Sequence, residues 1–273
     1  MIARTSDWSQ KLEAAAAWLL AFLWAAPLLY AFWAAFHPMD FVSRFDLSAP
    51  LTLDNFRNAW KVAPFARYFY NTFVLVCITL IGQFILCTMA AYAFARYEFP
   101  GKDIAFLLVL VQIMIMPDVL IVKNYQTISS LGLVDTILGI GLPYMASAFG
   151  IFLLRQAFKQ VPKELVEAAR VEGAGWFSVL WKVYIPLAKP TYLAYGLVSV
   201  SYHWNNFLWP VVITNSTETR PLTVGLSIFG APESGVNFSV ISAGTLLAVS
   251  PLLIAFLLFQ RQFVQSFMRS GIK

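Results

Sequence analysis

The fifth of six apolar stretches in this sequence carries a dense set of polar and aromatic side chains. The set comprises Ser199, Ser201, Tyr202, His203, Trp204, Asn205, Asn206 and Trp209. Indole rings stack on the apolar faces of sugars and polyols, and amide groups donate and accept hydrogen bonds toward hydroxyl groups. Polar groups at lipid depth are costly and usually face protein or water. The pattern predicts a path for a polyhydroxylated solute, lined by Gln83, Tyr144, Ser147, His203, Trp204, Asn205, Asn206 and Trp209.

A structural interpretation of the same side chains stays open. Trp204 and Trp209 would then belong to the aromatic belt at a membrane surface, while Asn205 and Asn206 would bond to neighbouring helices. His203 favours a hydrogen-bonded packing role over a proton relay. Asp118 follows Pro117, which favours a helix end and a loop anchor over ion coupling.

The second feature is an internal segment, VPKELVEAARVEGAGWFSVL, that holds the densest group of charges in the chain. Pro162 suits the first turn of a helix because its missing N–H would be unpaired there anyway. Glu164 lies in that turn, where the helix dipole favours negative charge. Gly173 is placed to end the helix in a left-handed cap, and Gly175 adds a second break. The pattern predicts a helix of about ten residues.

An apolar face resumes after this break. It consists of Trp176, Phe177, Val179, Leu180 and Val183. Small Ala168 and Ala169 on the first helix would let another surface approach the backbone, and Glu167 would offer a carboxylate beside that contact. Because such a face needs a cover, we expect the segment to insert into a socket on a different protein.

Composition sets the fold class. The chain has 273 residues, of which 59% are hydrophobic and only 12% charged, and its mean hydropathy is +0.69. Such a chain is too poor in charge to cover a globular surface, and about 20 apolar residues span a bilayer. The sequence therefore predicts an all-α membrane protein with six transmembrane helices in a single domain. The expected spans are roughly residues 14–36, 69–95, 104–122, 137–158, 191–213 and 238–259, with the charged segment in the loop 159–190.

Basic residues predict the orientation. With the N-terminus inside, inner segments hold 13 of the 19 Lys and Arg residues, from Arg4 to Lys273. The positive-inside rule then places both termini and the loop 159–190 in the cytoplasm. The net charge of +5 fits this distribution better than nucleic-acid binding, because no basic run is interleaved with exposed aromatics.

The remaining stretches are less specific. Segments 38–64 and 214–237 are the longer outside connections, and they either contact a soluble partner or merely join helices. Cys77 and Cys87 lie ten positions apart in one predicted helix, about 15 Å along its axis, which is too far for a disulfide. No Cys/His pair has ligand spacing, so we expect no metal site.

The run EAARVEGAG followed by VYIPLAKP resembles the EAA loop of permease subunits in bacterial ABC importers, whose pattern is E-A-A, three residues, G, then nine residues to I-x-L-P. Val183 stands at the I position, Ile185 at the L position and Pro186 closes the pattern. The runs around residues 132–158 and 202–214, together with RPLTVGL, are similar to the carbohydrate-uptake branch, with its maltose G-type and glycerol-3-phosphate E-type permeases.

The resemblance implies a machine of several subunits in a bacterial cytoplasmic (inner) membrane. It would contain two permeases, as a heterodimer, two ATPase subunits that use ATP and Mg²⁺, and an extracytoplasmic solute-binding protein. The loop would form coupling helices that insert into a cleft on an ATPase. The implied ATPase-coupling residues are Glu164, Glu167, Ala168, Ala169, Gly173 and Ala174. Expected solutes are a sugar, a polyol, glycerol-3-phosphate or a related glycerol conjugate.

Two other function classes stay open. An ion-coupled secondary carrier usually needs a buried carboxylate relay, for which only Asp118 qualifies. An intramembrane enzyme would need a motif such as H-E-x-x-H or paired carboxylates at lipid depth, and the sequence contains neither. It also contains no G-x-x-x-x-G-K-[ST] loop, so we expect no ATPase activity in this chain.

Overall fold

The computed structural model describes residues 7–46, 48–227 and 237–271 of the chain. All regular structure in these ranges is helical, without a strand, which confirms the predicted all-α class. The chain divides into two compact units, one made of residues up to Pro64 with Leu226–Ser250, the other of Phe65–Gly225 with the residues from Pro251 on. The single-domain organisation stays a prediction.

The first unit contains the long helix α1 (Asp7–Ala35) and the short helices α2 (Met39–Arg44) and α3 (Asp54–Val62). Most of the large apolar side chains of α1 are exposed, a pattern typical of a helix that faces lipid. The start of α3 is tied to the end of α1 by the buried Asn55 amide. It donates hydrogen bonds to the carbonyl oxygens of Ala35 and His37, at 3.0 and 2.9 Å.

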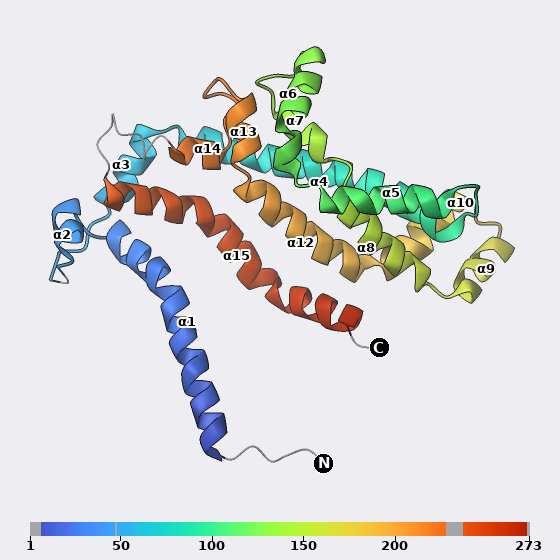
Figure 1. Ribbon diagram of the computed structural model, residues 1–273, viewed down its shortest axis with the longest axis horizontal. Coiled ribbons are helices and arrows are strands. Elements are labelled where there is room, and N and C mark those ends of the chain that lie inside the picture. Colours follow the sequence, from blue (N-terminus) through green and yellow to red (C-terminus); the bar gives the residue numbers. More distant parts are fainter. Residues whose placement is uncertain (1–6, 47, 228–236, 272–273) are drawn as a thin grey trace. The chain divides into compact units, whose positions relative to one another are not determined.

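The second unit is built along α4 (Phe65–Arg96), which packs closely on α8 (Ala148–Lys159) and α12 (Lys189–Asn205) (Figure 1). With 32 residues, α4 is about 48 Å long. The packing of α8 against α12 depends partly on Gly150, where a Cβ atom would lie 2.6 Å from Cζ of Tyr195. Gly150 therefore lets the buried Tyr195 ring lie against the backbone of α8.

Three of the six predicted spans are continuous helices that are long and apolar enough to cross a membrane. They are Gln10–Ala35 in α1, Phe65–Arg96 in α4 and Phe238–Leu258 in α15 (Phe238–Gly271). Two more become spans only if each pair of bent helices counts as one. The six-span count therefore stays a prediction, although every window contains helix.

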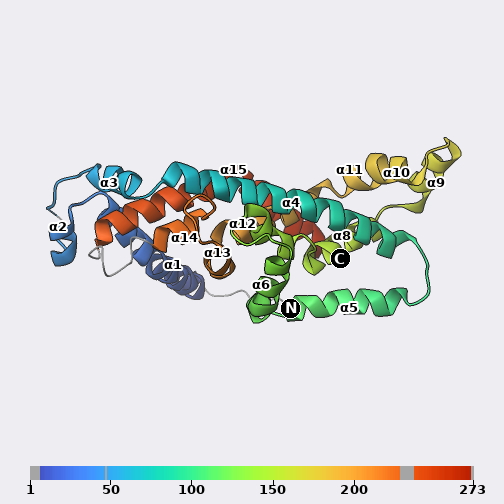
Figure 2. The ribbon, with the colours of Figure 1, turned by 90° about the horizontal axis from the view of Figure 1, so that it is seen from above.

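The third window breaks sharply. Helix α5 (Lys102–Met114) ends before Pro117, and the next helical pair, η1 (Pro117–Leu120) and α6 (Ile121–Ser130), turns away by 95° (Figure 2). A proline cannot donate its backbone hydrogen bond, and it disfavours helical geometry in the residue before it. This confirms the helix-ending interpretation of the Pro117–Asp118 pair.

The fourth and fifth windows are also interrupted. Helices α7 (Ile137–Gly141) and η2 (Leu142–Tyr144) meet α8 at a bend of 51°. The restart is capped by the Ser147 hydroxyl, which accepts a hydrogen bond from the Gly150 N–H. In the fifth window, α12 and α13 (Leu208–Ile213) flank the extended residue Asn206. Hydropathy windows cannot show such breaks, because both sides of each break are apolar.

Candidate solute cleft and coupling segment

The charged segment forms the helix α9 (Lys163–Val171), with Pro162 at its N-cap position. The structure confirms that this helix ends at Gly173 in a left-handed cap. Gly173 has φ +82°, its N–H donates to the Arg170 carbonyl at 2.9 Å, and the Ala174 N–H donates to the Ala169 carbonyl at 3.0 Å. These two bonds are the paired closing bonds of a Schellman motif. The chain then turns into α10 (Trp176–Val179), so two short helices meet at a glycine elbow.

The apolar face after the elbow divides between the interior and the surface. Val179 and Leu180 are buried in a core that also contains Phe158 and Tyr184, whereas Trp176 and Phe177 are exposed. Trp181 is exposed as well and stacks on Phe177 with a centroid distance of 6.3 Å. The sequence pattern did not assign Trp181 to this exposed face, because residues Leu180–Tyr184 form a π-helix. A π-helix rotates the side chains relative to their positions on an α-helix.

The predicted coupling residues also divide into two groups. Glu164, Glu167, Ala168 and Gly173 are exposed, and they form the outer surface of the elbow. Ala169 and Ala174 are half-buried and pack against the core cluster under the elbow. Their small size fits this packing, and the coupling role of all six residues stays a prediction.

Arg155 is a functional candidate that sequence reasoning treated only as an inner positive charge. Its side chain is buried in α8, its Nε donates to the Phe94 carbonyl at 3.3 Å, and its guanidinium lies 3.9 Å from the Phe106 ring centroid. A cation over an aromatic face is stabilised by the ring quadrupole. Arg155 therefore links α8 to the end of α4 and to α5 beneath the coupling segment.

Near the middle of the second unit lies a cleft of about 330 Å³. Four predicted path residues line it, namely Gln83, Tyr144, Ser147 and His203. Ser199 and Tyr202, which belong to the polar set of the fifth apolar stretch, line it as well. Sequence reasoning did not single out four other lining residues, namely Gln112, Asn124, Phe149 and Tyr195. Gln112 and Asn124 come from either side of the 95° bend, and Pro117 between them is the sequence signal that could have found them.

Gln83 organises the polar wall of this cleft. It is buried, its Nε2 donates to the Tyr144 carbonyl at 2.9 Å, and the same atom lies 3.1 Å from Nε2 of His203. Its Oε1 accepts a hydrogen bond from the Ser199 hydroxyl at 2.5 Å. Buried polar groups without partners would be costly, so this network holds α4, η2 and α12 in one arrangement.

The other four predicted path residues lie outside the cleft lining. Trp209 is buried and its Nε1 donates to the Ile140 carbonyl at 3.0 Å, while the Asn205 amide donates to Ser201 in its own helix. The Asn206 carbonyl accepts a bond from the Thr223 hydroxyl, and Trp204 contacts the Phe69 ring. Their place in a solute path stays a prediction.

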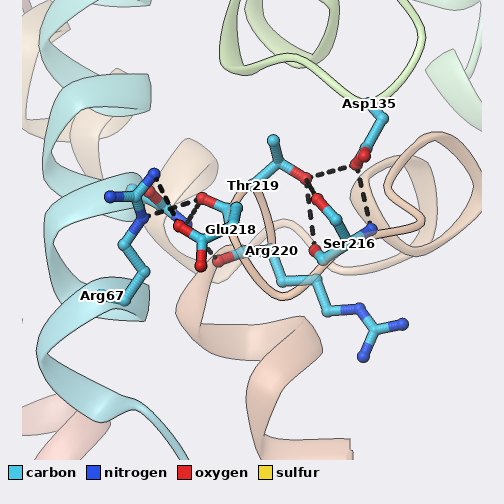
Figure 3. Close-up of polar contacts among 7 residues, drawn as sticks. Arg67, Asp135, Ser216, Glu218, Thr219 and Arg220 are labelled. Atoms are coloured by element: carbon cyan, nitrogen blue, oxygen red, sulfur yellow. Dashed lines mark hydrogen bonds and ion pairs between the residues drawn. The ribbon is translucent and has the colours of Figure 1, made fainter.

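Asp135 anchors the loop between α13 and α14 (Leu222–Leu226), although sequence reasoning did not single it out (Figure 3). Its carboxylate accepts hydrogen bonds from the Asn215 and Ser216 N–H groups, at 2.9 and 3.2 Å, and from the Thr219 hydroxyl. Partial burial acts to raise the pKa of Asp135, but these donors outweigh burial and lower the pKa to about 2. Asp135 also has φ +57°, a conformation that Asp tolerates better than most residues.

The same loop is held from α4 (Figure 3). Arg67 Nε and the Asn71 amide both donate to the Glu218 carbonyl, at 2.9 and 2.8 Å. The buried Thr72 hydroxyl accepts a bond from the Leu222 N–H at 2.8 Å. The Arg67–Glu218 ion pair at 3.2 Å is exposed and adds little by itself. The loop is thus fixed by hydrogen bonds rather than by surface charge.

We expect Asp135→Asn to weaken this anchor while keeping the backbone, because Asn also tolerates positive φ. Hydrogen bonds to a charged acceptor are the stronger kind, so the loss is about 1–2 kcal/mol near neutral pH. Because the folded pKa is depressed, the advantage of Asp135 is complete above the unfolded pKa and disappears as pH falls toward 2. Thermal unfolding in detergent between pH 7 and pH 3 measures this. An equal difference between the two proteins at every pH would contradict it.

Comparison with known proteins gives a consistent result. Residues 8–269 match the family described as "Binding-protein-dependent transport system inner membrane component". The chain is 33% identical over 261 residues to the arabinooligosaccharides transport system permease protein AraQ of Halalkalibacterium halodurans, covering 93% of each chain. It is 32% identical over 209 residues to the sn-glycerol-3-phosphate transport system permease protein UgpE of Yersinia enterocolitica, covering 76% of this chain and 74% of that one.

The fold also has a solved counterpart. A chain from the crystal structure of a bacterial ABC transporter involved in the import of the acidic polysaccharide alginate superposes with a TM-score of 0.84. The alignment covers 96% of this chain and 99% of the other, at 22% sequence identity. At that identity the likeness shows a shared fold.

Proposed function

Because this chain belongs to the family of binding-protein-dependent transport system inner membrane components, we propose that it is a permease subunit of an ATP-driven importer. It forms half of the translocation pathway and pairs with a second permease. The nucleotide chemistry takes place in two ATPase subunits with ATP and Mg²⁺, and an extracytoplasmic binding protein delivers the solute. The relatives' names support a carbohydrate, polyol or glycerol-phosphate solute for this chain.

The exposed elbow of α9 and α10 is the observation that carries the coupling role. A capped helix whose charged face and aromatic neighbours all lie on the surface is built for contact with a second protein. Glu164 and Glu167 offer carboxylates to that partner, and Trp176, Phe177 and Trp181 offer rings. Aromatic side chains at the centre of an interface commonly provide much of its binding energy.

Helix α4 supports a coupling contact on one side of the membrane and a solute-delivery contact on the other. Its first turns bond to the loop that Asp135 anchors, whereas near its far end the Arg96 guanidinium lies 5.5 Å from the ring centroid of Tyr184, below the elbow. A helix of this length and hydropathy crosses a bilayer once. Together with the distribution of basic residues, this favours a cytoplasmic elbow.

Movement of the docked elbow then biases the permease between two states. Closure of the ATPase pair displaces α9 and α10, and the packed core beneath them transmits this displacement to α4 and α8. Only a contact that differs in free energy between the two states shifts their populations. The Schellman cap and the buried Arg155 make the base of the elbow stiff, which such a contact requires.

Reconstitution tests the proposal. The chain is co-expressed with the second permease and the ATPase, placed in vesicles with the binding protein outside, and assayed for ATP-driven solute uptake. We expect uptake from the wild type, and loss of uptake with looser ATPase association from Glu167→Ala, although the variant still inserts in the membrane. Because Glu167 is exposed, folding is not at risk. Uptake without ATP, or driven by an ion gradient alone, would overturn the proposal.

A further inference from the structure

The cleft beside Gln83 has the composition of a sugar site. Its volume of about 330 Å³ lies near the lower end of the range for small-molecule sites. Phe149 and Tyr202 contribute exposed rings to its lining, and Gln112 and Asn124 contribute amides. Rings that stack and amides that both donate and accept are the groups that recognise a saccharide ring.

Two polar groups of the cleft have no partner among the described residues. The Tyr195 hydroxyl is buried and makes no hydrogen bond of acceptable distance and angle to a described residue. The Asn124 amide makes no hydrogen bond to any part of the chain that the structure describes. An unpaired polar group would be costly against a lipid chain, and a solute hydroxyl removes that cost.

The ionisable residues in and beside the cleft indicate whether its solute is neutral or anionic. Among the described residues that line the cleft there is no Lys, Arg, Asp or Glu. Asp118 lies at the neighbouring bend, and its carboxylate interacts electrostatically with the Tyr144 and Tyr202 hydroxyls. Sites for phosphate or carboxylate groups usually contain Arg or Lys, and a nearby carboxylate repels an anion.

We propose that this cleft receives one ring of a neutral saccharide, that Tyr195 and Asn124 bond its hydroxyl groups, and that Asp118 disfavours anionic solutes. The inference rests on the proposed function and deepens it. It selects between the two kinds of solute that the relatives suggest, favouring a neutral oligosaccharide over glycerol phosphate. His203 is excluded as a charge for an anion because its Nε2 is already engaged by Gln83.

The solute class is tested first on the binding protein of the same transporter. Its thermal unfolding is measured with arabinooligosaccharides, maltooligosaccharides, glycerol-3-phosphate and uronate oligosaccharides. We expect stabilisation by a neutral sugar. Stabilisation by the anionic compounds alone would overturn the inference and leave the proposed function intact.

The cleft itself is tested by uptake in the reconstituted complex. We expect Tyr195→Phe, which removes only the hydroxyl, to raise the half-saturating concentration of loaded binding protein about fivefold. Tyr125→Phe is the matched control, because Tyr125 is exposed on α6 and does not line the cleft. Equal uptake by both variants and the wild type would overturn the assignment of Tyr195.

Isosteric variants test whether the solute that passes through the cleft is neutral or anionic. For a neutral solute, Asn124→Asp keeps an acceptor and retains more uptake than Asn124→Leu. The reverse order would indicate an anionic solute and would overturn the inference. Asp118→Asn is expected to raise the uptake of an anionic analogue relative to that of the neutral sugar, and an unchanged ratio would overturn the role of Asp118. A wild-type complex that hydrolyses ATP but moves none of the tested solutes would instead refute the proposed function.

Discussion

Gly173→Pro is expected to abolish ATP-driven uptake while leaving the chain inserted in the membrane. Gly173 has φ +82°, which the proline ring cannot adopt, and its N–H donates to the Arg170 carbonyl, a bond that proline lacks. The Schellman cap is therefore lost on both counts, and α10 leaves α9 at a different angle. In the proposed coupling contact the exposed residues of both helices meet one partner surface, so even a small change in that angle would separate them from it.

Gly175→Pro is the matched control. Gly175 lies two residues further on in the same elbow, but its φ of −69° suits proline, and a side chain there would meet nothing within 4 Å. We expect this variant to keep most of the uptake. Gly173→Asn should retain more uptake than Gly173→Val, since Asn tolerates positive φ better than a β-branched residue. Uptake and ATPase co-purification measure all four variants, and similar losses at both glycines would contradict the cap argument.

The second large effect is expected at Gly139 in α7. A Cβ atom there would lie 2.1 Å from the carbonyl oxygen of Leu133, a backbone atom that cannot rotate away. That oxygen also accepts a hydrogen bond from the Thr136 hydroxyl, which in turn caps α7. Gly139→Ala must therefore displace the segment that carries Asp135, at a cost of about 3 kcal/mol, the upper part of the usual range for overpacking.

Gly82→Ala provides the comparison. Its new methyl group would meet the Met145 side chain at 2.9 Å, and that side chain is flexible enough to move aside. The two variants are compared by thermal unfolding in detergent and by the yield of monodisperse protein. We expect Gly139→Ala to lose stability and Gly82→Ala to resemble the wild type. Equal stability of the two variants would mean that α7 can shift at little cost. The hydrogen bonds of Asp135 would then not hold this segment in place.

Short-range chemistry made much of this molecule predictable. The start of α9 after Pro162 and its end at Gly173 follow from capping rules that involve only adjacent residues. Gln83, Tyr144 and His203 were found because polar side chains at lipid depth need partners, and the structure brings these three together.

Long-range pairing was not predictable. Asp135 bonds residues about 80 positions away, and nothing near Asp135 in the sequence announces those partners. Asn124 and Gln112 reach the cleft only because the chain bends by 95° between them, an angle that Pro117 permits but does not specify. Trp209 is a further case, since it is buried and its indole donates to the carbonyl of Ile140, 69 positions away, a partner that the sequence did not indicate.

Because α4 is one continuous helix, it can tilt as a rigid body about a point near its middle. Gln83 bonds α4 to η2 and α12 at a point roughly 20 Å from the Arg96 end of the helix and somewhat more from the Phe65 end. A tilt of about 5° around that point shifts the two ends in opposite directions by about 2 Å each, at the helix rise of 1.5 Å per residue. A displacement of the Arg96 end of α4 would thus move the Phe65 end in the opposite direction, and so widen or narrow the opening there, without any helix having to unwind.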